Sequence, residues 1–329
     1  MRVLVITNNL RQASYRLRIE SLIPAMKARG VDWIVEVRPR AAGARRQLLR
    51  GAADFDATIL QRKLLESGDA RLLRAHARRL YFDVDDAVMF GSPSEGWIGR
   101  LRGWRRFKAT ARRVDHVVAG NSYLAELFTR HGAPSASVIP TVVDAGRYVP
   151  SQRPPDGHVT LIWIGSASTL PYLSEALPYL KAAVTQVPGL KLKIVADTTL
   201  QSDKRLPIEY VPWSVENELS ALASSDIGIA PMAEDRWTLG KCGFKLLQYM
   251  AAGLPTIASP VGANASIIVN EESGLLASNE TQWIKAIFRL AGDEALRRRL
   301  GEAARLRVET HYSVVTAADA WSTLLQSKT

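Results

Sequence analysis

The stretch "KCGFKLLQYMAAGLPTIASPVG", residues 241–262, decides the fold of the C-terminal half of the chain. It joins a helical segment carrying Lys241 and Lys245 to an apolar strand through Ala-Ala-Gly-Leu-Pro, and the strand ends in a further glycine turn. If the helix begins near Gly240, the two lysines fall four apart on one face, beside the N–H groups and the positive dipole end of its first turn. Lysines at this end of a helix are costly unless an anion compensates them. The stretch therefore predicts a phosphate site, with two solvated surface lysines as the alternative.

The same order of strand and helix recurs along the whole chain. Short, nearly continuous apolar strands alternate with helical segments, which is typical of parallel sheets covered on both faces. The expected strands are residues 2–7, 33–38, 57–61, 80–84, 116–121 and 137–141 in a first series, and 159–165, 192–197, 208–213, 227–232, 255–260 and 274–278 in a second. The expected helices include residues 15–30, 171–185, 215–224, 242–252, 281–291, 293–313 and 316–327. The sequence predicts an α/β protein with two doubly wound parallel sheets.

The two series are separated by "VPSQRPPDGH", residues 149–158, whose three prolines and glycine indicate a linker. We therefore expect an N-terminal domain over residues 1–150 and a C-terminal domain over residues 151–315, a division that suits a chain of 329 residues. Ligands of open parallel sheets bind beyond the carboxyl ends of the strands. A central cleft that both domains face is the expected site.

The composition excludes several classes of protein. With 47% hydrophobic and 23% charged residues the chain is typical of globular proteins, and its single cysteine, Cys242, excludes an intramolecular disulfide framework and suits a reducing compartment. The start "MRVLVITNNL" lacks the pattern of a signal peptide, and no apolar run approaches the ~20 residues that span a bilayer. We expect a cytoplasmic protein, with contact to the inner face of the plasma membrane left open.

The net charge of +11 belongs to the first half of the chain. Residues 1–150 hold 26 Lys and Arg against 14 Asp and Glu, whereas the rest is close to neutral. Clusters lie at "ARRQLLR" (44–50), "RLLRAHARRL" (71–80) and "RLRGWRRFKATARR" (100–113). Such a surface suits anionic lipid headgroups, a phosphorylated acceptor or nucleic acid, and an arginine-rich solvated surface is the alternative. No sequence motif supports a nucleic-acid partner, so none is expected.

The quoted stretch resembles the donor-site motif of the GT-B-fold retaining glycosyltransferases of glycosyltransferase family 4, the group 1 glycosyltransferases. In that family a Lys-x-x-Glu-Tyr-Met-Ala-x-Gly-x-Pro run follows a strand. The segments "WIGS" (163–166), "VPW" (211–213) and "IGIAPM" (227–232) fit the same template in the same order. The resemblance covers the second domain nearly end to end and is weaker in the first. It implies the GT-B fold, two Rossmann-like domains facing a cleft, with helix 316–327 packing back onto the first.

The resemblance also implies an activity. It indicates a hexosyltransferase-like enzyme that moves a sugar from a nucleotide diphosphate sugar to a glycan, lipid-linked or other acceptor, with retention of the anomeric configuration. The second domain would hold the donor, and the first an acceptor such as a polyprenyl-linked sugar or a nascent polysaccharide. No cofactor and no metal are implied, because GT-B enzymes generally need no bound metal for transfer. The alternative is a catalytically impaired GT-B-like nucleotide- or glycan-binding scaffold.

The chain departs from the family pattern at two positions. Aligning Tyr249-Met250-Ala251 places Gln248 where the family grips the nucleotide ribose with a glutamate, and Gly240 where a second glutamate lies near the transferred sugar. Gln248 can still hydrogen-bond a ribose hydroxyl through its amide. Gly240 removes the side chain, so the resemblance leaves Lys241, Glu234 or Asp235 as substitutes.

Four further residues are expected to bind the nucleotide sugar. Gly165 and Ser166 end the first strand of the second domain and could offer N–H and hydroxyl contacts to the diphosphate, with a plain turn as the alternative. Ser14 is a candidate N-cap after the first strand of the chain. The resemblance puts this loop at the cleft, where Arg16 could grip a phosphate by its planar fork.

Asp83, Asp85 and Asp86 in "YFDVDDAVMF" directly follow a predicted buried strand. Three carboxylates in four residues repel one another, which indicates either a function or pairing with nearby arginines. They are the candidate catalytic residues, to orient an acceptor hydroxyl or act as its base, and turn capping is the alternative. As a metal site the cluster is incomplete, and the five histidines show no metal-ligand spacing.

Overall fold

The computed structural model describes residues 1–90, 97–150, 158–200 and 205–327, so most of the predicted linker lies outside the described residues. The chain forms two compact units. The first unit contains Met1–Val142, Asp235–Cys242 and Val314–Thr329, and the second contains Val143–Glu234 and Gly243–Ser313. The chain thus enters the first unit three times, whereas two entries were expected, over residues 1–150 and with helix 316–327.

The first unit contains a six-stranded parallel sheet in the order β2-β1-β3-β4-β5-β6. Its strands are β1 (Arg2–Thr7), β2 (Asp32–Val37), β3 (Ala57–Gln61), β4 (Leu80–Val84), β5 (His116–Ala119) and β6 (Ala136–Val138). Its helices are α1 (Ala13–Arg18), α2 (Ile23–Ala28), α3 (Ala42–Gly51), α4 (Ser67–His76), α5 (Trp97–Ala111), α6 (Ser122–Arg130) and α13 (Val314–Gln326), with 3-10 turns η1 (Glu20–Leu22), η2 (Ala52–Asp54) and η4 (Thr238–Gly240).

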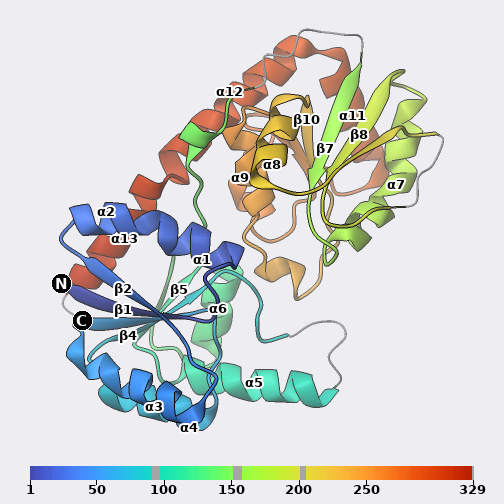
Figure 1. Cartoon of the computed structure of the whole chain (residues 1–329). Coiled ribbons are helices and arrows are strands. Elements are labelled where there is room, and N and C mark those ends of the chain that lie inside the picture. Colours follow the sequence, from blue (N-terminus) through green and yellow to red (C-terminus); the bar gives the residue numbers. More distant parts are fainter. Residues whose placement is uncertain (91–96, 151–157, 201–204, 328–329) are drawn as a thin grey trace. The chain divides into compact units, whose positions relative to one another are not determined.

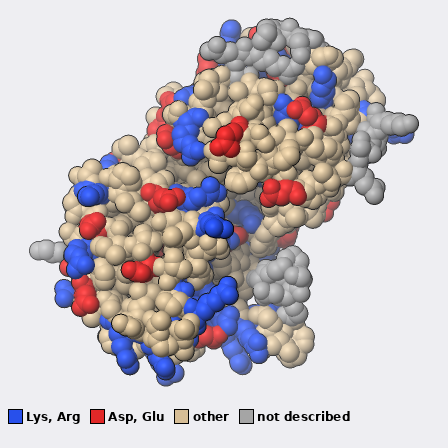
Figure 2. Space-filling model, viewed as in Figure 1, with Lys and Arg blue, Asp and Glu red and all other residues tan. Residues whose placement is uncertain are grey.

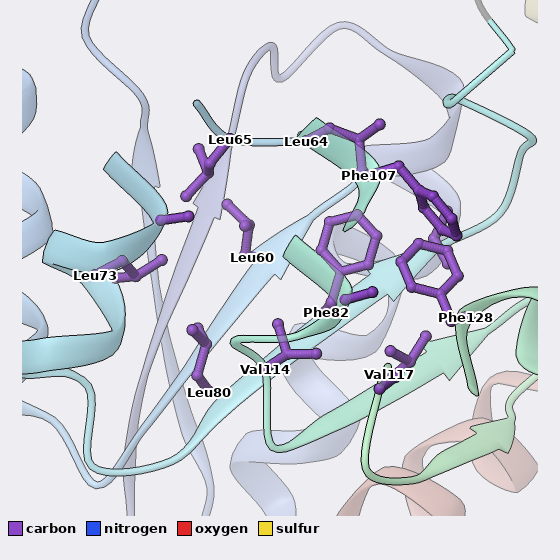
Figure 3. Packing of buried hydrophobic residues seen from close by; sticks show 14 of the residues in the cluster. Leu60, Leu64, Leu65, Leu73, Leu80, Phe82, Phe107, Val114, Val117 and Phe128 are labelled. Atoms are coloured by element: carbon purple, nitrogen blue, oxygen red, sulfur yellow. The ribbon is translucent and has the colours of Figure 1, made fainter. Parts of the chain in front are cut away.

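The first sheet has a hydrophobic core on each face, because successive side chains along a strand point to opposite faces. Leu60 and Phe82 pack with the helices α3, α4, α5 and α6, as Figure 3 shows for Phe107 and Phe128. The next residues along the strands face the opposite side, where α1, α2 and α13 cover the sheet (Figure 1). Because side chains alternate between faces, a strand buried on both sides reads as a continuous apolar run, which is the pattern in the sequence.

The C-terminal helix α13 is held on the first unit by aromatic contacts. The ring of Trp321 lies 5.6 Å from that of Trp33, edge to face, and 6.5 Å from that of Tyr81. The guanidinium of Arg79 donates to the carbonyl oxygen of Leu325 at 2.7 Å. Buried aromatic pairs of this geometry stabilise by about 0.5–1.5 kcal/mol each beyond their area.

The second unit contains a six-stranded parallel sheet in the order β12-β11-β10-β7-β8-β9. Its strands are β7 (Val159–Ile164), β8 (Leu190–Val195), β9 (Ile208–Val211), β10 (Ile227–Ala230), β11 (Thr256–Ala258) and β12 (Leu275–Leu276). Its helices are α7 (Leu170–Val184), α8 (Val215–Ala223), α9 (Phe244–Ala251), α10 (Asn264–Ile267), α11 (Glu280–Gly292) and α12 (Glu294–His311), with the 3-10 turn η3 (Ala145–Arg147). Helices α7 and α11 cover one face and α8, α9 and α12 the other. The predicted α/β class with two parallel sheets is confirmed.

Two predicted helices differ from the structure. The helix expected over 15–30 is interrupted at Ile19, whose ψ of −65° and φ of −121° are not helical, and it resumes at Ile23 with Pro24 in its first turn. The helix expected over 242–252 begins instead at Phe244, because Gly243 adopts a left-handed φ of +64°. Among the described residues, no helix has the length and apolar character needed to span a bilayer.

Candidate functional site

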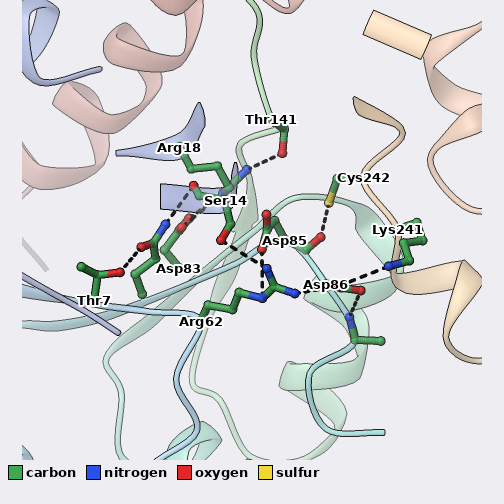
Figure 4. A network of polar contacts seen from close by, with 12 residues as sticks. Thr7, Ser14, Arg18, Arg62, Asp83, Asp85, Asp86, Thr141, Lys241 and Cys242 are labelled. Atoms are coloured by element: carbon green, nitrogen blue, oxygen red, sulfur yellow. Dashed lines mark hydrogen bonds and ion pairs between the residues drawn. The ribbon is translucent and has the colours of Figure 1, made fainter. Parts of the chain in front are cut away.

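The first unit holds a network of charged side chains beyond the carboxyl ends of β3 and β4 (Figure 4). Asp83 accepts from Nε and Nη2 of Arg18 at 2.6–3.1 Å, and the two side chains are only 1% and 2% exposed. Nη1 of Arg18 donates to the carbonyl oxygen of Ile139 at 2.9 Å. The prediction of a catalytic role does not fit Asp83, because its carboxylate is buried in a structural ion pair.

Arg62 connects the other two aspartates. Its Nη2 lies 2.8 Å from Oδ2 of Asp86, and its Nε lies 3.8 Å from Oδ1 of Asp85. Asp86 also accepts from Nζ of Lys241 at 3.3 Å and from the backbone N–H of Ala87 at 3.0 Å. Asp86 is therefore fully engaged, and Asp85 is the carboxylate with the weakest pairing.

Asp85 is held where its charged form is disfavoured. Burial raises the pKa of Asp85, and Arg62 and Arg18 offset this effect only in part. Asp83 and Asp86 act in the same direction as burial, since like charges disfavour ionisation. The side chain remains 15% exposed, so a ligand can reach it. A carboxyl group in this setting can exchange a proton closer to neutral pH than an ordinary aspartate.

The N-terminal loop contributes differently from the prediction. Helix α1 begins at Ala13 with Gln12 at the N-cap position, so Ser14 is inside the helix and does not cap it. Ser14 is buried, and its Oγ accepts from Nη1 of Arg62 at 3.2 Å. Arg16 is half-buried on the same helix.

The segment 235–242 is anchored on the first unit. Nδ2 of Asn121 donates to the carbonyl oxygens of Leu239 and Lys241 at 3.1 and 2.9 Å, and Sγ of Cys242 donates to that of Asp85 at 2.9 Å. The ammonium of Lys241 also lies 3.5 Å from the centre of the Trp237 ring. Burial lowers the pKa of Lys241, while Asp86 acts in the opposite direction. The prediction that Lys241 and Lys245 share one helix face is wrong: Lys241 precedes the helix and belongs to the other unit.

Gly240 is required by close packing. A Cβ at this position would lie 2.5 Å from Cβ of Ala87 and 2.9 Å from its backbone nitrogen. No side chain fits there, so this chain excludes a glutamate at the position where the family that its sequence resembles carries one. Of the proposed substitutes, Asp235 accepts from the N–H groups of Trp237 and Thr238 at 2.7 Å and so caps the turn η4.

The second unit brings Gln248 and Glu218 together. Both are nearly buried, at 4% and 8% exposure, and Nε2 of Gln248 donates to Oε1 of Glu218. Nε1 of Trp213 donates to the other carboxylate oxygen at 2.8 Å. Burial raises the pKa of the neighbouring Tyr148 to about 12, Glu218 adds to this shift and Gln248 opposes it. With Nε2 directed to Glu218, the amide oxygen is the acceptor that Gln248 can offer a ligand.

Lys245 and Gly165 are linked through Trp163. The Lys245 ammonium lies 4.6 Å from the centre of the Trp163 ring. A Cβ on Gly165 would collide with that ring, so the glycine makes room for the indole. The N–H of Gly165 donates to the carbonyl oxygen of Val195 at 3.1 Å, and that of Ser166 to Oγ1 of Thr169 at 3.2 Å. Both N–H groups predicted to bind phosphate are therefore already bonded, that of Gly165 to strand β8 and that of Ser166 within the turn, and the role of Gly165 is steric.

The hydroxyl of Tyr249 links strands β7 and β10 next to this site. Beyond Gly228 the strands β7 and β10 no longer pair, and the Tyr249 hydroxyl accepts from the N–H of Ile164 at 2.8 Å and donates to the carbonyl oxygen of Ile229 at 3.3 Å. The hydroxyl thus makes hydrogen bonds to both strands where their backbones no longer pair with each other. It also fixes helix α9, which carries Lys245 and Gln248.

Sequence reasoning missed Arg62, Glu218 and Trp163. Arg62 directly follows the predicted strand 57–61, so the rule that identified the aspartates could have identified it. Glu218 lies four residues before Leu222 on the apolar stripe of α8, which was a usable signal. Within the described residues, no group of three or more His, Cys, Asp or Glu side chains is placed to hold a metal.

Comparisons with known proteins define the class. Residues 158–293 match the family model described as "Glycosyl transferases group 1", so the second unit carries a group 1 glycosyltransferase domain, as the sequence predicted. No curated protein matches the chain significantly in sequence. Solved structures share the fold over the whole chain, and they identify it as the GT-B fold of glycosyltransferases.

Three of these structures illustrate the similarity. HepE of Anabaena, solved with UDP and glucose, has a TM-score of 0.71 at 15% identity, with both chains covered to 100%. Sucrose-phosphate synthase of Thermosynechococcus elongatus has a TM-score of 0.70 at 17% identity, covering 98% of each chain. A glycosyltransferase of Rickettsia africae has a TM-score of 0.69 at 11% identity, covering 100% of this chain and 99% of its own.

Proposed function

We propose that the protein transfers a sugar from a nucleotide diphosphate sugar to a glycan or lipid-linked acceptor, with retention of the anomeric configuration. The observation that carries this proposal is the buried contact of Gln248 with Glu218, because the sequence resemblance assigns the ribose-binding position to Gln248. An amide fixed by a buried carboxylate offers a ribose hydroxyl one directed acceptor, which replaces the family's glutamate oxygen.

The second unit supplies the charge that the leaving diphosphate requires. Lys245 lies in the first turn of α9, where backbone N–H groups and the helix dipole also favour an anion. Stabilisation of the leaving diphosphate is the main electrostatic task in such a transfer. Arg16 is a second candidate for a phosphate contact. We propose that transfer requires no bound metal, in which case EDTA leaves the rate unchanged.

A donor-hydrolysis assay tests this function. UDP-, GDP- and ADP-sugars are incubated with the protein, and release of the nucleoside diphosphate is followed; UDP-glucose comes first because solved HepE contains it. We expect turnover with one of the three bases. Nucleotide binding without turnover of any donor would favour the alternative, a catalytically impaired binding or scaffold protein.

We propose Asp85 as the carboxylate that contacts the acceptor hydroxyl. Because its pKa is raised in the folded protein, its contribution to stability is present at low pH and lost as the pH rises through that pKa. Asp85→Asn should therefore gain stability relative to the wild type on going from pH 4 to pH 7.5, while the transfer rate falls by about 10²-fold. Thermal melts at both pH values and initial rates check this.

The exposed Asp54→Asn serves as the control for Asp85→Asn and should change neither quantity. A stability gain without loss of transfer would show that Asp85 is only a strained structural residue. Loss of both stability and transfer would show that the carboxylate of Asp85 supports the fold.

We also propose that the protein binds the inner face of an anionic membrane. Trp97, Ile98 and Leu101 on helix α5 are 75%, 50% and 44% exposed, and Arg100, Arg102 and Arg105 are exposed on the same helix. Figure 2 shows basic side chains gathered over this part of the first unit. An aromatic residue among arginines suits the headgroup region. Salt-insensitive or absent sedimentation with anionic liposomes would exclude it, and binding to duplex or single strands would point to a nucleic-acid partner instead.

A further inference from the structure

The first unit contains a polar pocket that the sequence did not reveal. It has a volume of about 280 Å³ and lies beyond the carboxyl ends of β1 and β3, with helix α5 as one wall. Its polar lining is formed by Asn8, Gln12, Arg62, Lys63 and Arg106. Gly99 and Gly103 also line it, four residues apart on one face of α5, so this wall has no side chains to fill the space.

A strained turn supplies two of the pocket's cations. Arg62 has a φ of +57°, which is rare for a residue with a side chain. The N–H of Lys63 donates to the carbonyl oxygen of Gln61 at 2.6 Å, so Arg62 is the central residue of a γ-turn with positive φ, the uncommon and strained form. Strain of this kind persists where the surrounding structure enforces it, and it concentrates at ligand-binding sites. The consequence here is that consecutive residues, Arg62 and Lys63, both line the pocket.

The charges around the pocket are unbalanced. Within the described residues its lining contains three cations and no carboxylate. Arg62 is paired with Asp86 and Arg106 with Glu66, but the described part of the chain holds no ion pair of Lys63. Burial lowers the pKa of Lys63, repulsion from Arg38 and Arg106 lowers it further, and Glu66 opposes these effects without cancelling them. An ammonium group held among like charges is stabilised by an anion that enters the pocket.

We propose that this pocket binds an anionic group of the acceptor, a phosphate or a carboxylate, so that the acceptor is a charged sugar derivative. The proposal rests on the proposed function, which assigns the acceptor to the first unit. The ammonium of Lys63, for which the described part of the chain holds no ion pair, supplies a positive charge to the anion. The guanidinium groups of Arg62 and Arg106 add planar donors. The side-chain amides of Asn8 and Gln12 complete the polar lining. A second hollow, lined by Arg102, Arg105 and Arg106, adjoins it through the shared Arg106 and extends the basic surface.

Calorimetry on the full chain tests this site. The protein is first saturated with UDP, so that the donor site is filled, and is then titrated with glucose 1-phosphate or with neutral methyl glucoside. We expect the phosphate ester to bind and the glucoside to bind at least about tenfold more weakly, as loss of a charge-assisted contact predicts. Lys63→Gln should weaken binding of the phosphate ester about tenfold, and Lys63→Arg should restore most of it. Lys27→Gln, an exposed lysine on α2, is the matched control.

Each outcome has a distinct meaning. Equal binding of the two sugars, unchanged affinity in Lys63→Gln, or loss of phosphate-ester binding when UDP is added would overturn the anion pocket. Failure of UDP, GDP and ADP alike to bind would refute the proposed function without touching the pocket, which is then titrated without nucleotide. A parallel titration with a short polyprenyl phosphate in neutral detergent identifies the source of the anion, since a lipid-linked acceptor binds more tightly than the free sugar phosphate.

Discussion

Replacing Asp83 with alanine should lower the free energy of unfolding by about 3–5 kcal/mol, because it leaves the guanidinium of Arg18 buried without a counter-charge. The arginine cannot lose its proton to escape this cost, since its pKa is far above any accessible pH. It also cannot reach water without breaking its bond to the carbonyl oxygen of Ile139. Urea denaturation followed by circular dichroism measures the change.

The first unit offers a matched control in the ion pair of Arg29 and Asp319. These side chains are also an Arg–Asp pair at 2.7 Å, but Asp319 is 63% exposed. Asp319→Asn should therefore cost less than about 1 kcal/mol. The double variant Arg18→Met/Asp83→Leu should recover most of the stability lost in Asp83→Ala, because it buries no charge. Equal effects of the two single substitutions would refute the assignment of Asp83 to a structural role.

The strands and the fold class could be predicted because they depend on local pattern. Each of the twelve expected strands overlaps a strand of the structure, since strands buried on both faces leave nearly continuous apolar runs in the sequence. The parallel direction of the strands follows from the alternation with helices, whereas the order of the strands in each sheet does not. The GT-B resemblance rested on the same local stretch that the family model matches.

The candidate site was harder to predict because its contacts are long-range. A helix was expected to begin near Gly240, but hydrogen bonds from Asn121, more than a hundred residues away, hold the carbonyl groups of Leu239 and Lys241 on the first unit. Similarly, the N–H of Gly165 donates to the carbonyl oxygen of Val195, and this hydrogen bond depends on the register of β7 and β8. Which of three adjacent aspartates is buried also depends on where Arg18 lies. None of these contacts can be predicted from the spacing of residues along the sequence.

Replacing Gln248 with glutamate, the residue of the related family, should impair this protein rather than improve it. The new carboxylate would face that of Glu218 in a nearly buried setting, where two like charges cannot both be accommodated. We expect the free energy of unfolding to fall by about 3–5 kcal/mol, the cost of an uncompensated buried charge. Nucleoside diphosphate affinity should fall with it, because a carboxylate repelled by Glu218 no longer holds its oxygen at the ribose position.

The exchanged pair Glu218→Gln/Gln248→Glu should reverse both defects. The amide would then stand at 218 and donate to a carboxylate at 248, which restores the hydrogen bond with its polarity inverted and returns the family's glutamate to the ribose position. A double-mutant cycle of unfolding energies and of UDP affinities measures the coupling, which for contacting residues reaches about 0.5–3 kcal/mol. Additive effects would show that the two side chains act independently. Rescue of stability without rescue of nucleotide binding would confine the pair to the fold and remove Gln248 from the donor site.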